Sequence, residues 1–165
     1  MALTKERLKQ LLRYEPKTGI FYPMERRRGV RFGVPAGAKS TSLGYILICV
    51  DRVHYCAHRL AWLYMTGKWP KNQIDHKDGS RDNNRWENLR EATVSQNRCN
   101  AKIRSDNTSG YKGVHRGGST GNRWRAAITI NGKRYIIGYF DDPGKAFRAR
   151  TVALRKFHGE FARAQ

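Results

Sequence analysis

Two strand-like segments, RWRAAITI and KRYIIGYF, flank Asn131-Gly132 toward the C-terminus. Asn-Gly is the strongest short-range signal for a β-hairpin, because both residues tolerate the positive φ angles of a two-residue turn. GYKGVHR upstream predicts a further strand, and Asp142-Pro143 downstream predicts a helix start, with an N-cap residue before proline. Residues 111–162 therefore predict three strands and one helix.

The hairpin turn also determines which residues share a face of the sheet, since side chains alternate along a strand. One face is expected to be apolar, with the cross-strand pairs Ile128 with Tyr135, Ala126 with Ile137, and Trp124 with Tyr139. The helix is expected to pack an apolar stripe against this face and to end at Gly159; the stripe comprises Ala146, Ala149, Ala153 and Phe157, with Phe147 and Leu154 beside it. The other face is basic: Thr129 lies opposite Arg134, alongside Arg123, Arg125 and Ile136. It predicts a surface that reads nucleic acid.

The whole chain is strongly basic. Its 165 residues include 33 Lys and Arg against 13 Asp and Glu, a formal net charge of +20. The basic residues run along the entire sequence and are dense at 26–31, a segment that could either follow a nucleic-acid backbone or form a disordered loop. A solvated surface is the simpler explanation, but this imbalance in a short chain favours a polyanionic partner, and nucleic acid first.

Other classes of protein are disfavoured. The longest apolar run, LAWLYM at 60–65, is too short to cross a bilayer, and the sequence shows neither an amphipathic anchor nor a secretory signal. Cys49, Cys56 and Cys99 are odd in number and lack CxxC spacing, so we expect reduced thiols rather than disulfides or a cysteine-rich zinc site. We expect a cytoplasmic protein with no membrane partner and no small-molecule cofactor.

Residues 1–72 mix short strands with helices. KTGIFYP and LGYILICVDRVHYCAHRL predict strand pieces with turns at Gly19 and at Asp51-Arg52. HRLAWLYMTG predicts a helix that Gly67 closes.

The stretch IDHKDGSRDNNRWENLREATVSQN, residues 74–97, predicts a strand, a polar loop, a second strand at NLR and then a helix. Thr93 followed three residues later by Gln96 is a capping-box signature, so the helix is expected to begin at Val94 and to carry Asn97.

This stretch has the residue types that phosphodiester hydrolysis needs: a base to activate water, and ligands for a cation that relieves the charge on the phosphate. His76 can be the base, because a neutral imidazole has a pKa of ~6.5. Asp75 and Asn97 offer hard oxygen ligands for Mg²⁺. Adjacent strand residues point to opposite faces, so Asp75 is expected to face the helix and His76 the substrate. Asn88 on the neighbouring strand can hold the loop and orient the imidazole; taken alone, Asp75 and His76 could equally be a satisfied polar pair.

DH, NNRWENL and QN resemble the HNH endonuclease motif of phage homing endonucleases, with asparagine at the final position where many relatives have histidine. YCAHRLAWLYMTGKWP is similar to what precedes the motif in phage members. The resemblance implies a ββα-metal finger, one divalent ion (Mg²⁺, with Mn²⁺ as a substitute) and cleavage that leaves a 3′-hydroxyl and a 5′-phosphate. By motif position it implies His76 as general base, Asp75 and Asn97 as metal ligands and Asn88 as the orienting asparagine. His58 could cap its helix, pack beneath the site or take part in catalysis, with a structural role favoured.

YKGVHR, RWRAAITING, YIIGYFDDPGKAFRAR and ALRKFHGEFA resemble the AP2 DNA-binding domain over nearly all of 110–162. That family lays its three-stranded sheet in the DNA major groove. The positions that the resemblance implies as DNA contacts are Lys112, Gly113, His115, Arg123, Thr129, Arg134 and Ile136. Analysis of the sheet faces adds Arg116 and Arg125. His115 and Thr129 stand where the plant transcription factors commonly have arginine, and Ile136 where they have tryptophan, so a GC-box preference does not transfer.

These observations predict an α+β protein. We expect an HNH nuclease domain at 1–100, which consists of an N-terminal extension at 1–72 and the ββα-metal motif at 73–100. A linker is expected at 101–110. An AP2-like domain of three antiparallel strands and one helix is expected at 111–165. The leading hypothesis is a metal-dependent, site-specific homing-type endonuclease that nicks double-stranded DNA as a monomer, in the host cytoplasm if it is phage-encoded. The alternatives are a DNA-binding regulator with a relic nuclease motif and an RNA-binding basic protein.

Overall fold

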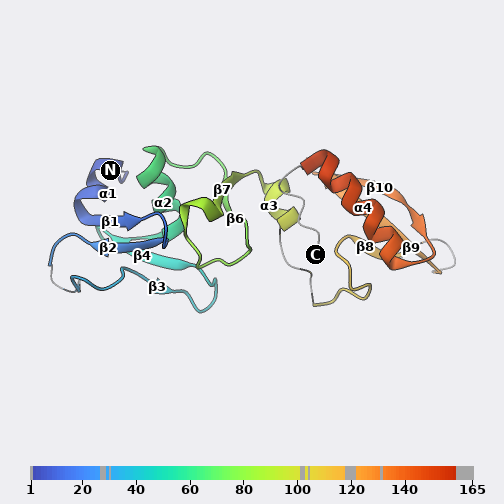
Figure 1. The fold of residues 1–165 in the computed structure, drawn as a ribbon, viewed down its shortest axis with the longest axis horizontal. Helices are drawn as coiled ribbons and strands as arrows, with labels where there is room; N and C mark the ends of the chain where they lie inside the picture. The colour runs from blue at the N-terminus through green and yellow to red at the C-terminus, as the bar shows by residue number, and fades with distance from the viewer. Residues whose placement is uncertain are drawn as a thin grey trace. The chain divides into compact units, whose positions relative to one another are not determined.

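The chain forms two compact units, residues 1–92 and 93–165 (Figure 1). The computed structural model describes residues 2–26, 29, 31–100, 103, 105–117, 122–130 and 132–158, and only the backbone of 98–100 and 158. The expected α+β class is confirmed, because both units combine helices with small antiparallel sheets. Within the described ranges, no helix is long and apolar enough to cross a membrane.

The first unit begins with helix α1 (Lys5–Leu11) and ends with a two-stranded ribbon, β6 (Gln73–His76) and β7 (Leu89–Ala92). The elements between them are β1 (Leu12–Glu15), β2 (Ile20–Pro23), β3 (Ala38–Lys39), β4 (Ile46–Val50), β5 (Val53–Cys56), α2 (Ala57–Thr66) and the 3₁₀ turn η1 (Trp86–Asn88). Strand β1 pairs with β2, and β4 lies between β3 and β5; all these pairs are antiparallel.

Local signals in the sequence set the ends of these elements. Asp51 and Arg52 have φ angles of 46° and 68°, so the predicted two-residue turn between β4 and β5 is confirmed. Helix α2 ends as predicted at Gly67, whose φ of 80° lets its N–H donate to the carbonyl of Leu63.

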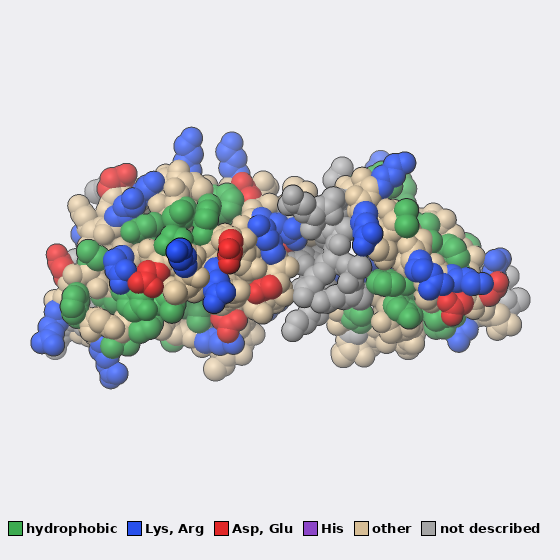
Figure 2. All heavy atoms as spheres, in the orientation of Figure 1, with side chains coloured by type: hydrophobic (Ala, Val, Ile, Leu, Met, Phe, Trp, Pro, Cys, Tyr) green, Lys and Arg blue, Asp and Glu red, His purple; other side chains and the backbone are tan. Residues whose placement is uncertain are grey.

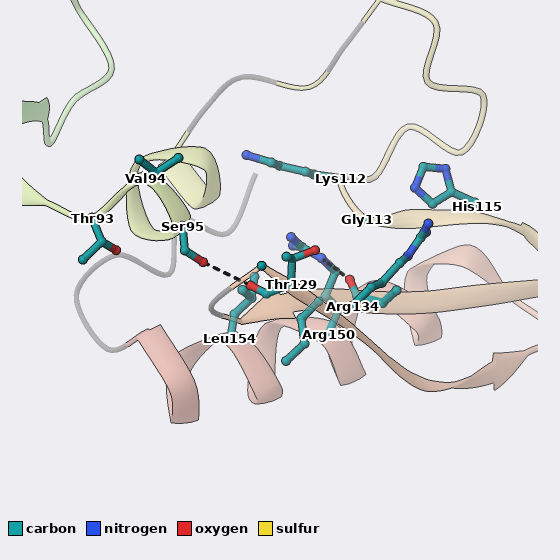
Figure 3. A pocket seen from close by; sticks show the side chains of 13 residues that line it. Thr93, Val94, Ser95, Lys112, Gly113, His115, Thr129, Arg134, Arg150 and Leu154 are labelled. Atoms are coloured by element: carbon teal, nitrogen blue, oxygen red, sulfur yellow. Dashed lines mark hydrogen bonds between the residues drawn. The ribbon is translucent and has the colours of Figure 1, made fainter. Parts of the chain in front are cut away.

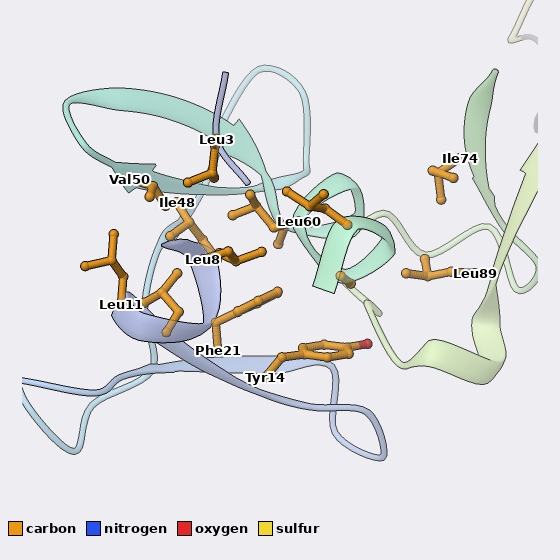
Figure 4. Packing of buried hydrophobic residues seen from close by; sticks show 14 residues of the cluster. Leu3, Leu8, Leu11, Tyr14, Phe21, Ile48, Val50, Leu60, Ile74 and Leu89 are labelled. Carbon is orange, nitrogen blue, oxygen red and sulfur yellow. The ribbon is translucent and has the colours of Figure 1, made fainter. Parts of the chain in front are cut away.

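One apolar core joins the helices and strands of the first unit. Leu8 of α1, Phe21 of β2 and Leu60 of α2 are fully buried in it (Figure 4). Ile74 and Leu89 of the ribbon belong to the same cluster. Because Ile74 directly precedes Asp75, burial of this isoleucine anchors the strand that carries the proposed catalytic residues.

The second unit consists of α3 (Val94–Asn100), β8 (Val114–Gly117), β9 (Arg123–Ile130), β10 (Lys133–Phe140) and α4 (Pro143–His158). The strands form one antiparallel sheet in the order β10-β9-β8, and α4 packs against one face of it through two small apolar clusters. The three strands and one helix expected from the sequence are confirmed.

Both predicted helix starts are also confirmed. The N–H of Thr93 donates to Oε1 of Gln96 at 2.8 Å and the N–H of Gln96 donates to Oγ1 of Thr93 at 3.3 Å, which is the capping box at the start of α3. Asp142 caps α4, accepting from the N–H of Lys145 at 2.8 Å. Asn131 and Gly159, which the sequence predictions used, lie outside the described ranges, as do parts of the basic segment 26–31 and of the predicted linker 101–110.

The hairpin register is correct near the turn and wrong beyond it. Thr129 pairs with Arg134 and Ile128 with Tyr135, as predicted. A β-bulge between Ile136 and Gly138 then shifts the register, and the observed pairs are Ala126 with Gly138, Arg125 with Tyr139, and Trp124 with Phe140. The extra residue moves Tyr139 away from the apolar face, where the sequence placed it, to the face of Arg125.

The buried stripe of α4 differs from the predicted one. Phe157 is 55% exposed, and the buried residues are Ala146, Arg150 and Leu154, which follow one another at four-residue intervals. Arg150 can occupy a buried position because its aliphatic stem is apolar and its Nε donates to the carbonyl of Ala127 at 3.2 Å.

Candidate functional site

Asp75 and Arg90 form a buried ion pair across the β6–β7 ribbon, where they lie directly opposite each other. Nε of Arg90 is 2.9 Å and Nη2 is 2.8 Å from the same carboxylate oxygen, Oδ2 of Asp75. The carboxylate therefore has a fixed orientation and a nearby positive charge. No group of three His, Cys, Asp or Glu side chains that could hold a metal is found in the part of the chain that the structure describes.

His76 faces the other side of the ribbon, as the strand alternation predicts. Its ring is 4% exposed, and Nε2 lies 3.2 Å from Oδ1 of Asn84. The Asn84 amide is oriented by its Nδ2, which donates to the carbonyl of Asp82 at 3.2 Å. Since an amide oxygen only accepts, Nε2 of His76 carries the proton and Nδ1 keeps the lone pair. Burial lowers the pKa of His76 below its ordinary 6.5, so the ring is neutral at physiological pH.

Asn88 holds the loop between the two ribbon strands. Its Oδ1 accepts from the N–H of Asp78 at 3.0 Å, and its Nδ2 donates to Oδ1 of Asp78 at 3.0 Å and to the carbonyl of Asn83 at 2.8 Å. Asn88 ends the 3₁₀ turn η1 rather than lying on the second strand, as the sequence had suggested. Asn84 forms a hydrogen bond with Nε2 of the His76 ring.

A second histidine lies beside His76. The His58 ring, near the start of α2, is T-shaped against the His76 ring at a centroid distance of 5.2 Å. Tyr45 packs on both, at 4.9 Å from His58 and 6.0 Å from His76. Burial, followed by the charges of His76 and Arg59, lowers the pKa of His58 to about 3.

The second unit contains an open basic pocket of about 690 Å³ (Figure 3). Five of the predicted DNA contacts line it: Lys112, Gly113, His115, Thr129 and Arg134. Arg150 of α4 also lines the pocket, as does Ser95 of α3, whose hydroxyl donates to the carbonyl of Thr129 at 3.4 Å. Gly113 has a φ of 72°, and a Cβ there would collide with Arg150. Cationic and hydroxyl groups around one hollow fit the anionic oxygens of a nucleic-acid backbone.

The other four predicted DNA contacts lie outside this pocket. Arg123 and Arg125 are on β9, and Ile136 on β10 is exposed. The Arg116 guanidinium stacks on the Trp124 ring at 4.1 Å, on the face that α4 covers, so Arg116 does not share the face of Arg125. Figure 2 shows Lys and Arg side chains over the visible face of both units.

Comparison with known proteins supports the nuclease motif. A family model for the HNH endonuclease matches residues 55–99. Protein 3.8 of Escherichia phage T7 is 34% identical over 116 residues, which cover 64% of this chain and 87% of the phage protein. The chain belongs to the family of this phage protein. It has an HNH endonuclease domain at 55–99. No solved structure matches the chain.

The HNH match extends from the end of β5 to α3. It includes all the residues predicted for the nuclease site: Asp75, His76, Asn88 and Asn97. Asn97 lies on α3, which belongs to the second compact unit, and its N–H donates to the carbonyl of Thr93 at 2.9 Å. HNH family membership implies DNA as the substrate.

Sequence reasoning missed three residues of potential functional importance. These are Asn84, Arg90 and Arg150, none of which was named as a candidate site residue. Arg90 could have been found from the strand pairing, because a residue opposite Asp75 on an antiparallel ribbon is its neighbour. The contact of Asn84 with His76 depends on the path of the loop, which has no sequence signal.

Replacing Asn88 by alanine should destabilise the protein by about 2–3 kcal/mol, because it removes three hydrogen bonds and leaves buried loop groups unpaired. Urea denaturation of both proteins measures the difference. Asn72, whose side chain is exposed, supplies the control: Asn72→Ala should change stability by less than about 0.5 kcal/mol. Equal stability of the two variants would mean that Asn88 does not hold the loop.

Proposed function

We propose that this protein is a metal-dependent endonuclease that hydrolyses phosphodiester bonds of duplex DNA and, as a site-specific homing-type enzyme, nicks one strand. The observation that carries the proposal is the environment of His76 within the HNH match: a buried, neutral imidazole whose Nε2 is tied to Asn84. In this tautomer Nδ1 carries the lone pair of the neutral imidazole, and we propose that it takes a proton from water.

HNH nucleases generally use a divalent metal ion. Asp75 fits such an ion as one ligand, because a carboxylate oxygen is a hard donor and Arg90 fixes its orientation. We assign Asn97 as a further ligand from its motif position, and Mg²⁺ as the ion, with Mn²⁺ as a substitute. When bound, the ion would offset the negative charge that builds up on the phosphate.

Incubation of the full chain with supercoiled plasmid tests the proposal. With Mg²⁺ or Mn²⁺, nicked circles should accumulate before linear DNA, because a monomer with one nuclease domain cuts one strand at a time. EDTA should stop the reaction. Tight binding without any nicking, on plasmids that include DNA of a related phage, would favour the alternative that the protein is a DNA-binding regulator with a relic nuclease motif.

We also propose that the second unit binds duplex DNA in the manner of an AP2 domain, through the basic pocket and the sheet face that carries Arg134. The support is the position of Lys112, Arg134 and Arg150 around one hollow in a chain of charge +20. Phosphate contacts of this kind release counterions, so affinity should fall steeply as salt rises.

Arg134→Ala should weaken duplex binding and reduce the slope of log Kd against log salt by about one, the loss expected for one phosphate contact. Fluorescence anisotropy at several salt concentrations measures both quantities. Arg155→Ala, which removes an exposed arginine of α4, is the matched control and should leave the slope unchanged. If both variants reduce the slope equally, binding depends on net charge and not on this face.

A further inference from the structure

His58 is almost completely enclosed by protein. It follows Ala57, the first residue of α2, is 7% exposed, and contacts the rings of Tyr45 and His76. The two imidazoles meet edge to face, with an interplanar angle of 81°. His58 is therefore placed to affect the groups next to the proposed base.

One polar atom of the His58 ring is not used by the fold. Its Nδ1 is buried and has no hydrogen-bond partner among the described residues. A buried polar atom without a partner destabilises a protein, and leucine has a similar volume without that cost. Packing alone therefore does not account for a histidine at this position. The low pKa of His58 keeps the ring neutral, so it can exchange hydrogen bonds without adding a charge beside His76.

A cation lies close to the same aromatic cluster. The Arg81 guanidinium stacks on the Tyr45 ring at 5.1 Å, and its Nη1 donates to the carbonyl of Leu43 at 2.9 Å. Arg81 is exposed, whereas the two histidine rings that Tyr45 contacts are buried. An anionic DNA backbone that approaches Arg81 comes next to the histidine pair.

We infer that His58 is a positioning residue of the nuclease site: its Nδ1, buried in the free protein, becomes accessible when DNA binds and forms a hydrogen bond to an oxygen of the hydrated DNA backbone beside His76. This inference rests on the proposed nuclease function. The oxygen can belong to the phosphate or to a water molecule bound to it; both are acceptors and partners for a neutral imidazole.

Two substitutions separate this role from packing. His58→Leu keeps the volume and removes the ring nitrogens; it should retain or raise Tm, yet lower kcat for plasmid nicking about 10- to 100-fold. His58→Asn keeps a polar atom at the δ position and should recover part of that loss. If His58→Leu lowers kcat and leaves the Kd for duplex unchanged, the oxygen that His58 contacts belongs to water. If His58→Leu also raises the Kd, the oxygen belongs to the phosphate.

A measurement that needs no cleavage distinguishes failure of this inference from failure of the proposed function. In EDTA, addition of a phosphorothioate duplex to ¹⁵N-histidine-labelled protein should shift the Nδ1 resonance of His58. Without such a shift, or with His58→Leu nicking as fast as wild type, the inference is wrong. It is also wrong if both variants lose turnover in proportion to lost Tm. If the Nδ1 resonance shifts but the wild-type protein nicks no DNA, the contact between His58 and DNA is supported and the proposed nuclease function is wrong.

Discussion

His76→Ala lowers the rate of plasmid nicking by about 10²- to 10⁴-fold, the usual contribution of a general base, and leaves duplex affinity unchanged. The reason is that Nδ1 of His76 carries the lone pair in a ring whose Nε2 forms a hydrogen bond with Asn84. Initial rates on supercoiled plasmid, with anisotropy for binding, measure the two effects separately. His54→Ala, an exposed histidine of β5, is the control and should nick at the wild-type rate. Equal rates for all three proteins would reject His76 as the base.

The same assignment sets the direction of the pH dependence. Burial lowers the pKa of His76 below 6.5, and only the neutral ring can accept a proton. The nicking rate should therefore rise with pH through a pKa below 6.5 and be level at neutral pH. A rate that rises only above pH 8 would assign the base to another group.

Arg90→Ala should destabilise the first unit by about 3–5 kcal/mol, because it leaves the Asp75 carboxylate buried without the cation that neutralises it. Chemical denaturation of the full chain measures the loss. The double variant Asp75→Ala/Arg90→Ala should lose much less than the sum of the two single variants, since the partners are then removed together. Arg13→Ala breaks an exposed pair with Glu15 and should cost less than about 1 kcal/mol.

The Arg90 variant also tests metal binding without any cleavage assay. If Asp75 is a metal ligand, Mg²⁺ or Mn²⁺ can partly replace the missing positive charge and should raise the denaturation midpoint of Arg90→Ala more than that of wild type. The ion should have no such effect on the double variant. Identical responses of all three proteins to the ion would reject Asp75 as a ligand.

Local structure was largely predictable from the sequence, because it depends on neighbouring residues. The Asp51-Arg52 turn, the Gly67 helix end, the Thr93–Gln96 capping box and the Asp142 cap all follow from backbone geometry and side-chain chemistry within a few residues. The HNH match at 55–99 likewise rests on the spacing of residue types along the chain.

The predictions from the sequence were wrong where packing between distant segments determines the position of a side chain. Regular alternation placed Tyr139 on the apolar face, but the bulge after Ile136 moved it to the face of Arg125. Hydrophobicity placed Phe157 in the helix core, whereas Arg150 took a buried place because Ala127 offers a carbonyl. Neither a bulge nor such a hydrogen bond has a signal in the local pattern.

The sequence by itself determined the class of most elements, several of their ends, and the set of residue types that a nuclease needs. Only the tertiary structure decided which nitrogen of His76 carries the lone pair, that Asp75 is paired with Arg90, and that His58 and Tyr45 lie beside His76. The physical reason is that an imidazole has two nitrogens, and its tautomer depends on which acceptor the folded chain brings to one of them. Here that acceptor is Asn84, on a loop that is also held from β1, since the hydroxyl of Tyr14 donates to the carbonyl of Asn84 at 2.7 Å.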